Sequence, residues 1–218
     1  DEELLAEGID PVLVHNPNYV KANGVLDDIE LFDADFFGYT PREAEIIAPQ
    51  QRLFLECSWE AMENAGYDVD RIEGQVGVFA GAGMNSYLLH NILPRRDLME
   101  SIGEHQLTIT NKDDFLPTRT SYKLNLKGPS VNVQTACSTS LVAVHLACKS
   151  ILNGECNMAL TGGITVDIPQ KKGYLYQQDM VVSSDGHCRA FDAAAQGIVS
   201  GSGVGVLVLK RFDQALAD

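Results

Sequence analysis

A short apolar stretch that ends in small residues and leads directly into an amphipathic helix constrains this chain more than any other feature. Over residues 130–136, Val131 and Val133 alternate with polar residues, as is typical of a β-strand. Residues 139–152 then repeat apolar side chains with helical spacing. The sequence therefore predicts a strand, a tight turn and a helix, with Cys137 in the turn at the N-terminus of the helix.

This predicted position of Cys137 favours chemistry that uses a thiolate. The first N–H groups of a helix have no partner within it, and they form the positive end of its dipole. Both effects stabilise the thiolate, which is the nucleophilic form of cysteine. The alternative is that Cys137 is a small buried core residue. We expect that structural role for Cys57, Cys148 and Cys156.

The composition excludes several classes of function. The 218 residues are sufficient for one large α/β domain or a large part of one, and the net charge of −14 argues against binding to nucleic acid or anionic lipid. The five cysteines form no Cys-x-x-Cys pair and no zinc-finger spacing, which predicts reduced thiols, no metal site and a cytoplasmic protein. No apolar run is long enough for a membrane span, and no signal peptide is visible.

Strands alternate with helices along the chain, which predicts a layered α/β sheet without an evident internal domain boundary. The apolar residues of 156–167 are nearly continuous, as is typical of a strand buried on both faces. We expect a polar connection over residues 94–111 and a long excursion of surface loops beside a site over residues 168–202. The other strands are expected at 75–80 and 204–210, and the other helices at 41 onward, 49–65, 86–93 and 115–124.

Both ends of the sequence look cut. The chain begins at Asp1 within a helical pattern and ends at Asp218, where a helix has barely begun. We therefore expect it to be a fragment of a larger protein.

The glycine-rich segments do not predict a nucleotide site. Gly81-x-Gly83 follows a strand, but Ser86 occupies the position of the third glycine in a dinucleotide fingerprint. The glycines at 201, 203 and 205 precede a strand, which is the wrong order for a phosphate loop. The Gly-x-Ser-x-Gly elbow of serine hydrolases is absent, and Ala136-Cys137-Ser138 takes the comparable position with sulfur.

A nucleophilic cysteine normally needs a base, and no histidine fits that role well. His145 follows Cys137 by eight residues, about 12 Å along a helix axis, so it cannot reach the thiol. His187 lies in the loop region and could approach the site, but its neighbours favour a structural role in a turn.

Several long stretches resemble one known family: the β-ketoacyl synthase domains of modular type I polyketide synthases, which are condensing enzymes with a thiolase fold. The resemblance covers essentially the whole chain and identifies residues 1–218 as the N-terminal part of one such domain. Its first strand and its C-terminal half would be missing. The matching stretches are Leu-Phe-Asp-Ala-Asp-Phe-Phe-Gly (31–38), Pro-Arg-Glu-Ala (41–44), Pro-Gln-Gln-Arg-Leu-Phe-Leu-Glu (49–56), Trp-Glu-Ala (59–61), Asn-Ala-Gly-Tyr (64–67), Gly-Pro-Ser (128–130), Thr-Ala-Cys-Ser-Thr-Ser (135–140), Asp-Gly-His-Cys-Arg-Ala-Phe-Asp (185–192) and Gly-Ser-Gly (201–203).

The resemblance implies a mechanism and a fold. Cys137 would accept an acyl chain as a thioester, and its backbone N–H would form part of an oxyanion hole. Decarboxylation of a malonyl-type extender would then give a carbanion that attacks the thioester, in polyketide or fatty acid biosynthesis. The fold would be a thiolase-like layered α/β fold, with helices packed on a mixed, mainly parallel sheet, incomplete at both ends. The family's two decarboxylating histidines lie in its C-terminal half, and no residue here matches their motifs.

The resemblance also implies partners and leaves alternatives. Acyl carrier proteins would deliver both thioesters on their phosphopantetheine arms, and the domain itself would bind no cofactor. Other polyketide synthase domains would lie in the same chain, and residues 130–135 would pair with a second copy in a homodimer. A non-condensing loader or partner subunit, a thiolase and an unrelated cysteine hydrolase are the alternatives. One departure from the family is Asp179, where relatives often carry glycine.

Overall fold

The computed structural model describes residues 1–218 and divides into two compact units. The larger unit comprises residues 28–165 and 204–218, and the smaller unit comprises residues 1–27 and 166–203. The sequence shows no linker where the units join, so this division was not expected.

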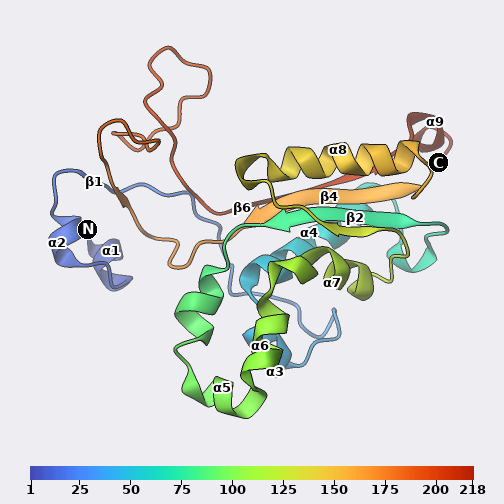
Figure 1. Ribbon diagram of the computed structural model, residues 1–218, viewed down its shortest axis with the longest axis horizontal. Helices are drawn as coiled ribbons and strands as arrows, with labels where there is room; N and C mark the ends of the chain where they lie inside the picture. Colours follow the sequence, from blue (N-terminus) through green and yellow to red (C-terminus); the bar gives the residue numbers. More distant parts are fainter. The chain divides into compact units, whose positions relative to one another are not determined.

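A four-stranded sheet in the order β3-β2-β4-β6 forms the centre of the larger unit (Figure 1). Strand β2 (Val76–Ala82) pairs in parallel with β3 (Ser130–Asn132) on one side and with β4 (Met158–Thr165) on the other. Strand β6 (Gly203–Lys210) lies beside β4 at the edge of the sheet. Its last residue, Lys210, lines the same cavity as Val76 and Met158, the first residues of β2 and β4. Strand β6 therefore runs antiparallel, and the predicted mixed, mainly parallel sheet is confirmed.

Helices cover both faces of this sheet. Figure 1 shows α8 (Thr139–Leu152) on one face, and α4 (Pro49–Asn64) and α7 (Leu116–Lys123) on the other. All three were predicted within one or two residues, because their apolar positions repeat with helical spacing. On the α8 side, a buried cluster joins Ala143, Ala147 and Ile151 to Phe79 and Ala159 of the sheet. Strand β4 is almost completely buried, as its continuous apolar sequence predicts.

The connection after β2 is helical, so the prediction of a polar connection over residues 94–111 is wrong. It contains α5 (Arg96–Ile102) and α6 (Glu104–Asn111), which follow a π-helical turn, η2 (Leu88–Ile92), within the predicted helix at 86–93. Ile92, Leu98 and Leu107 form a buried cluster with Ile46 of α3 (Pro41–Ile46). The remaining faces of α5 and α6 are polar, which concealed their helical character in the sequence.

The smaller unit has little regular structure. It contains α1 (Glu2–Ala6), α2 (Pro11–Val14) and a two-stranded antiparallel sheet of β1 (Tyr19–Val20) and β5 (Tyr174–Leu175). The side-chain amide of Gln170 exchanges two hydrogen bonds with the backbone of Leu26, at 2.8 and 2.9 Å. Residues 176–202 are irregular, which confirms the predicted loop excursion.

Three short 3₁₀ turns in the larger unit, η1 (Val69–Arg71), η3 (Asp113–Phe115) and η4 (Ala136–Ser138), and the short helix α9 (Phe212–Ala215) complete the elements. None of the helices combines the length and the apolar character that a bilayer crossing requires.

Candidate functional site

Cys137 lies in the turn that joins β3 to α8, at the end of the sheet where the parallel strands finish. It is exposed and occupies the middle of η4, two residues before the first residue of α8. The predicted order of strand, turn and helix is therefore confirmed. The strand is shorter than predicted, because β3 ends at Asn132, and a 3₁₀ turn separates the thiol from the α-helix proper.

Hydroxyl groups fix the shape of this turn. The Thr139 hydroxyl accepts a hydrogen bond from the N–H of Thr135 at 3.0 Å and donates one to the carbonyl of Ala136 at 2.8 Å. The Ser138 hydroxyl donates to the carbonyl of Thr135 at 2.8 Å. Ser138 and Thr139, the first two residues of the Ser-Thr-Ser run after the cysteine, therefore satisfy backbone groups that a tight turn leaves without partners. Sequence reasoning noted this run but did not assign it that role.

Ala136 carries the strain of the turn. Its φ of +53° lies in the left-handed region, which residues with a Cβ rarely adopt. Such a conformation persists only where surrounding contacts hold it, and it is often found at functional sites. Alanine gives no signal of this conformation in the sequence, so the strain could not be predicted.

The sheet supports the turn from the other side. A Cβ on Gly81 of β2 would lie 1.9 Å from the carbonyl oxygen of Val133 and 2.5 Å from the Thr139 side chain. Only glycine permits the start of α8 to lie this close to β2. The side-chain amide of Gln134 also donates to the carbonyl of Ala82 at 2.9 Å. Cys137 is thus presented on a backbone that is anchored on both sides.

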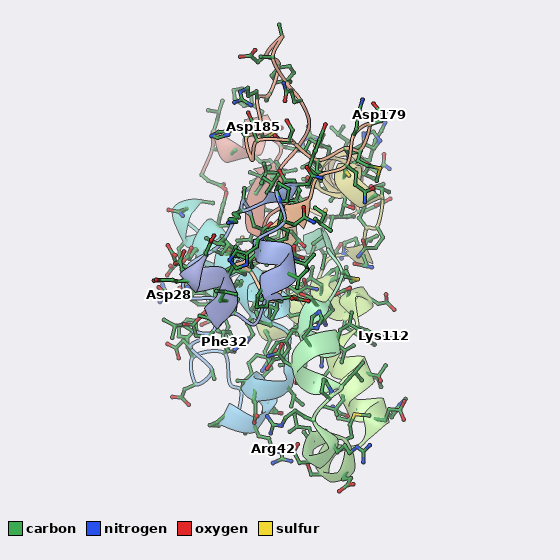
Figure 2. All side chains as sticks on the ribbon, turned by 90° about the vertical axis from the view of Figure 1, so that its left-hand side faces the viewer. Asp28, Phe32, Arg42, Lys112, Asp179 and Asp185 are labelled. Carbon is green, nitrogen blue, oxygen red and sulfur yellow. The ribbon has the colours of Figure 1, made fainter.

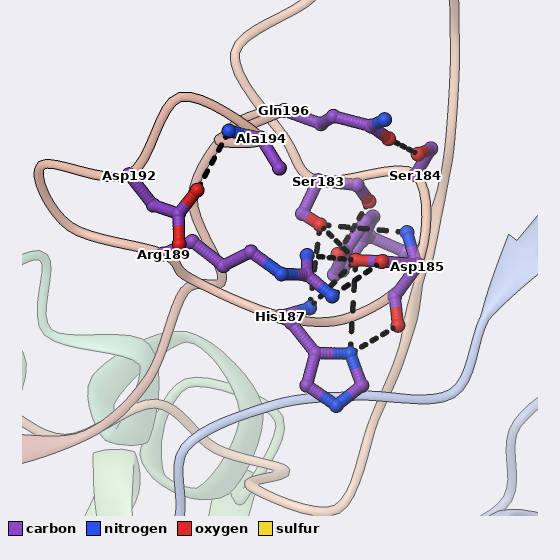
Figure 3. Close-up of polar contacts among 9 residues, drawn as sticks. Ser183, Ser184, Asp185, His187, Arg189, Asp192, Ala194 and Gln196 are labelled. Atoms are coloured by element: carbon purple, nitrogen blue, oxygen red, sulfur yellow. Dashed lines mark hydrogen bonds and ion pairs between the residues drawn. The ribbon is translucent and has the colours of Figure 1, made fainter.

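The histidines occupy the kinds of position that the sequence indicated. His145 is exposed on the surface of α8. His187 belongs to a hydrogen-bonded turn in the smaller unit, where its N–H donates to Asp185 Oδ1 at 3.2 Å and its Nδ1 lies 2.9 Å from the Asp185 carbonyl (Figure 3). Hydrogen bonds from Arg189 and Ser183 hold the pKa of the Asp185 carboxyl far below its ordinary value. Asp185 is therefore the centre of the turn, and His187 is part of its framework.

The other cysteines differ in burial. Cys156 is buried, 3.5 Å from the Ser150 hydroxyl, and Cys57 is half-buried with a pKa raised by burial. Cys148 is exposed, so the prediction that it is a core residue is wrong. It follows Ala147, which faces the sheet, and the helical rotation turns Cys148 away from the core. No three His, Cys, Asp or Glu side chains are grouped in a way that would hold a metal ion.

Comparisons with known proteins identify the family of the chain. The sequence profile of the family described as "Beta-ketoacyl synthase, N-terminal domain" matches residues 3–215. The chain is 48% identical over 222 residues to a phenolphthiocerol/phthiocerol polyketide synthase of Mycobacterium tuberculosis, covering 99% of the chain and 15% of that protein. It is 44% identical over 200 residues to the pikromycin polyketide synthase component PikAII of Streptomyces venezuelae, covering 90% of the chain and 5% of that protein.

A solved structure resembles the whole chain. Ketosynthase twelve of the bacillaene polyketide synthase from Bacillus amyloliquefaciens superimposes with a TM-score of 0.89 at 40% identity, covering 100% of this chain and 38% of that one. This likeness confirms the predicted thiolase-like layered fold. The chain thus spans well under half of that ketosynthase and a small part of its curated relatives. Its profile match, sequence relatives and fold together place the chain in the β-ketoacyl synthase family, where it matches the N-terminal domain.

Proposed function

We propose that Cys137 is the nucleophile of a ketosynthase that extends polyketide chains by decarboxylative condensation. The observation that carries the proposal is the exposed thiol on the strained turn after β3, inside the family match over residues 3–215. The thiolate attacks the carbonyl carbon of an acyl chain carried on the phosphopantetheine arm of an acyl carrier protein. The bond between the carbonyl carbon and the pantetheine sulfur breaks, and that sulfur takes up the proton that Cys137 gave up. The acyl chain remains on Cys137 as a thioester.

The second half of the reaction uses a malonyl-type extender on another carrier protein. Loss of carbon dioxide leaves a carbanion, which attacks the carbonyl carbon of the Cys137 thioester. The cysteine thiolate is expelled, and a β-ketoacyl chain two carbons longer remains on the extender's carrier protein. The backbone N–H of Cys137 would stabilise the oxyanion in both attacks, because η4 holds this part of the backbone in a fixed position.

The partners of this reaction follow from the same proposal. Two carrier proteins supply the substrates, and the domain needs no bound cofactor of its own. Curated relatives such as the Mycobacterium polyketide synthase are much longer than the chain, which supports further polyketide synthase domains in the same polypeptide.

We also propose a homodimer in which β3 pairs with its counterpart from a second copy. Strand β3 is an edge of the sheet, so its outer backbone groups lack a neighbouring strand. Val131 is 37% exposed there, and the side-chain oxygen of Asn132 is buried without a hydrogen-bond partner. A two-fold contact would cover Val131 and pair the outer backbone groups of β3 through one self-complementary surface.

A condensation assay tests the catalytic proposal in the complete ketosynthase domain that contains this chain. Acyl carrier protein and malonyl carrier protein are supplied, and the β-ketoacyl product is detected by mass spectrometry. Cys137→Ala should abolish the product, whereas Cys148→Ala, which removes an exposed thiol further along α8, should preserve it. A Cys137→Ala variant that condenses at the wild-type rate would refute the assignment.

A further inference from the structure

Two consecutive glutamines at the start of α4 are buried in the interior of the larger unit. Gln50 is 1% exposed and Gln51 is 2% exposed. Each side-chain NH2 group donates to a backbone carbonyl, whereas each side-chain oxygen is buried without a donor from the chain. A buried polar atom without a partner is unfavourable, and methionine would fill a similar space without one. The contacts of the NH2 groups are therefore what an amide contributes at these two positions.

The NH2 group of Gln50 joins segments that are distant in the sequence. It donates to the carbonyl of Gly83, the residue after β2, at 3.1 Å, and to Oδ1 of Asp113, in η3, at 2.8 Å. Burial raises the pKa of the Asp113 carboxyl, and the hydrogen bond from Gln50 opposes this effect. The start of α4 is thereby connected to the end of β2.

Gly83 is held on its other side by β4. Its N–H donates to the carbonyl of Ile164 at 2.8 Å. A Cβ on Gly83 would lie 2.2 Å from the hydroxyl oxygen of Thr165, so the backbone approaches β4 as closely as only glycine permits. The carbonyl that Gln50 contacts therefore belongs to a residue that is fixed between α4 and β4.

The residue before Gly83 supports the turn that contains Cys137. The carbonyl of Ala82 accepts a hydrogen bond from the side-chain amide of Gln134 at 2.9 Å, and Gln134 lies three residues before the cysteine. Gln50 and Gln134 thus hold consecutive carbonyl groups at the end of β2, one from α4 and the other from the turn. Because consecutive planar peptide groups share a Cα, a displacement of the Gly83 carbonyl also displaces that of Ala82.

We propose that Gln50 is a positioning residue for Cys137 and acts through the end of β2. In this role Gln50 keeps the Ala82 carbonyl where Gln134 can reach it, and so maintains the turn that presents the thiol. Gln50 does not touch the substrate, and the inference rests on the proposed role of Cys137 as the nucleophile. Loss of its NH2 group leaves the thiol less well oriented, which slows the attack without weakening substrate binding.

Gln51 offers a matched comparison, because it is equally buried and makes the same kind of contact elsewhere. Its NH2 group donates to the carbonyl of Lys112 at 3.1 Å. Lys112, which is labelled in Figure 2, directly follows α6 and belongs neither to β2 nor to the turn at Cys137. Loss of the Gln51 amide should therefore reduce stability without slowing the reaction of the thiol.

Single-turnover acylation by acetyl-pantetheine, in the full-length protein that contains this chain, tests the proposal. Mass spectrometry of the Cys137 peptide gives the rate at a series of thioester concentrations. Gln50→Met should lower the maximal rate about tenfold and leave the half-saturating concentration unchanged, whereas Gln51→Met should retain the wild-type rate. Thermal unfolding checks that both variants are folded. A wild-type rate in folded Gln50→Met, or an equal loss of rate in Gln51→Met, would overturn the proposal.

A double-mutant cycle tests the route through the end of β2. Gln134→Met should also slow acylation, and its combination with Gln50→Met should be no slower than the slower single variant, because both changes release the same backbone. Rate losses that multiply in the double variant would show that Gln50 does not act through Gln134, which would overturn the proposal. If Gln50→Met does not give folded protein, Gln50→Asn, which is one methylene too short to reach Gly83, takes its place in both comparisons with the same expected outcomes.

The wild-type protein separates this inference from the proposed function. If acetyl-pantetheine does not acylate Cys137 in the wild type, the assignment of the nucleophile fails and this inference fails with it. If the wild type is acylated at Cys137 and Gln50→Met is acylated equally fast, the positioning role of Gln50 fails alone.

Discussion

The hydroxyl group of Thr139 lies 3.0 Å from the backbone nitrogen of Thr135, so that the first residue of α8 closes the turn that begins four residues earlier. The same hydroxyl donates to the carbonyl of Ala136 at 2.8 Å. The Thr139 side chain therefore holds the N–H of Thr135 and the carbonyl of Ala136, the residue with the strained φ directly before Cys137. The geometry around Cys137, the proposed nucleophile, depends on this threonine, although Thr139 does not touch the substrate in the proposed mechanism.

Replacing Thr139 by valine should loosen the turn, because valine keeps the shape of the side chain but removes both hydrogen bonds. We expect a loss of about 1–3 kcal/mol in the free energy of unfolding and slower acylation of Cys137. Denaturant unfolding and single-turnover acyl loading measure the two effects. Thr139→Ser keeps the hydroxyl and should stay near wild type in both; if valine also matches wild type, the turn does not depend on this hydroxyl.

Gly81→Ala should be severely destabilising. The new methyl group would lie 1.9 Å from the carbonyl oxygen of Val133, and neither the sheet nor α8 can move aside without losing packing. We expect the free energy of unfolding to fall by more than about 3 kcal/mol, or the variant to give no soluble protein. Gly203→Ala is the matched control, because a Cβ there meets no atom within 4 Å. Equal stability of the two variants would contradict the close approach of α8 to β2.

Asp179→Gly should stabilise the smaller unit. Asp179 has a φ of +65°, the left-handed conformation that glycine adopts without strain, which is consistent with the glycine that the family resemblance leads us to expect there. We expect the free energy of unfolding, measured by thermal unfolding, to rise by up to about 1 kcal/mol. Asp27→Gly, at an exposed position without a positive φ, should instead be neutral or destabilising. A loss of stability in Asp179→Gly would show that the aspartate side chain compensates for the strain.

The turn around Asp185 should weaken in acid. The pKa of the Asp185 carboxyl is lowered in the folded state, chiefly by Arg189. The stabilisation that the carboxylate contributes is therefore present above the ordinary aspartate pKa of about 4, and it is lost as the pH falls through the folded-state pKa. Amide exchange at His187, whose N–H donates to Asp185, reports this turn directly. Protection should fall below about pH 4 in wild type, whereas in Asp185→Asn it should already be weak at neutral pH. Protection in Asp185→Asn equal to wild type at neutral pH would contradict this role.

Elements with a strong apolar period were predictable, and those that depend on distant contacts were not. Helices α4 and α8 bury one regular face each, so their limits followed from local pattern. Helix α5 is stabilised by contacts of Leu98 with a cluster that includes Ile46, more than 50 residues away, and no local signal reveals such a contact. The exposure of Cys148 likewise depends on which face of α8 meets the sheet.

The position of the candidate site in the chain could be predicted from the sequence, but its detailed geometry could not. The run of small and hydroxyl residues around Cys137 indicated a turn before a helix, and the structure has one. The left-handed conformation of Ala136 and the hydrogen bonds of Thr139 arise from the fit between α8 and β2. That fit depends on Gly81, which is about 50 residues earlier in the chain.

Peptide mapping of the acylated protein tests the central claim most directly. The complete ketosynthase domain is incubated with an acyl-pantetheine thioester, digested and analysed by mass spectrometry for the modified cysteine. We expect the acyl group on Cys137 alone, and none after Cys137→Ala. Acylation of Cys148 or Cys188 instead, with normal loading of the Cys137→Ala variant, would contradict the account.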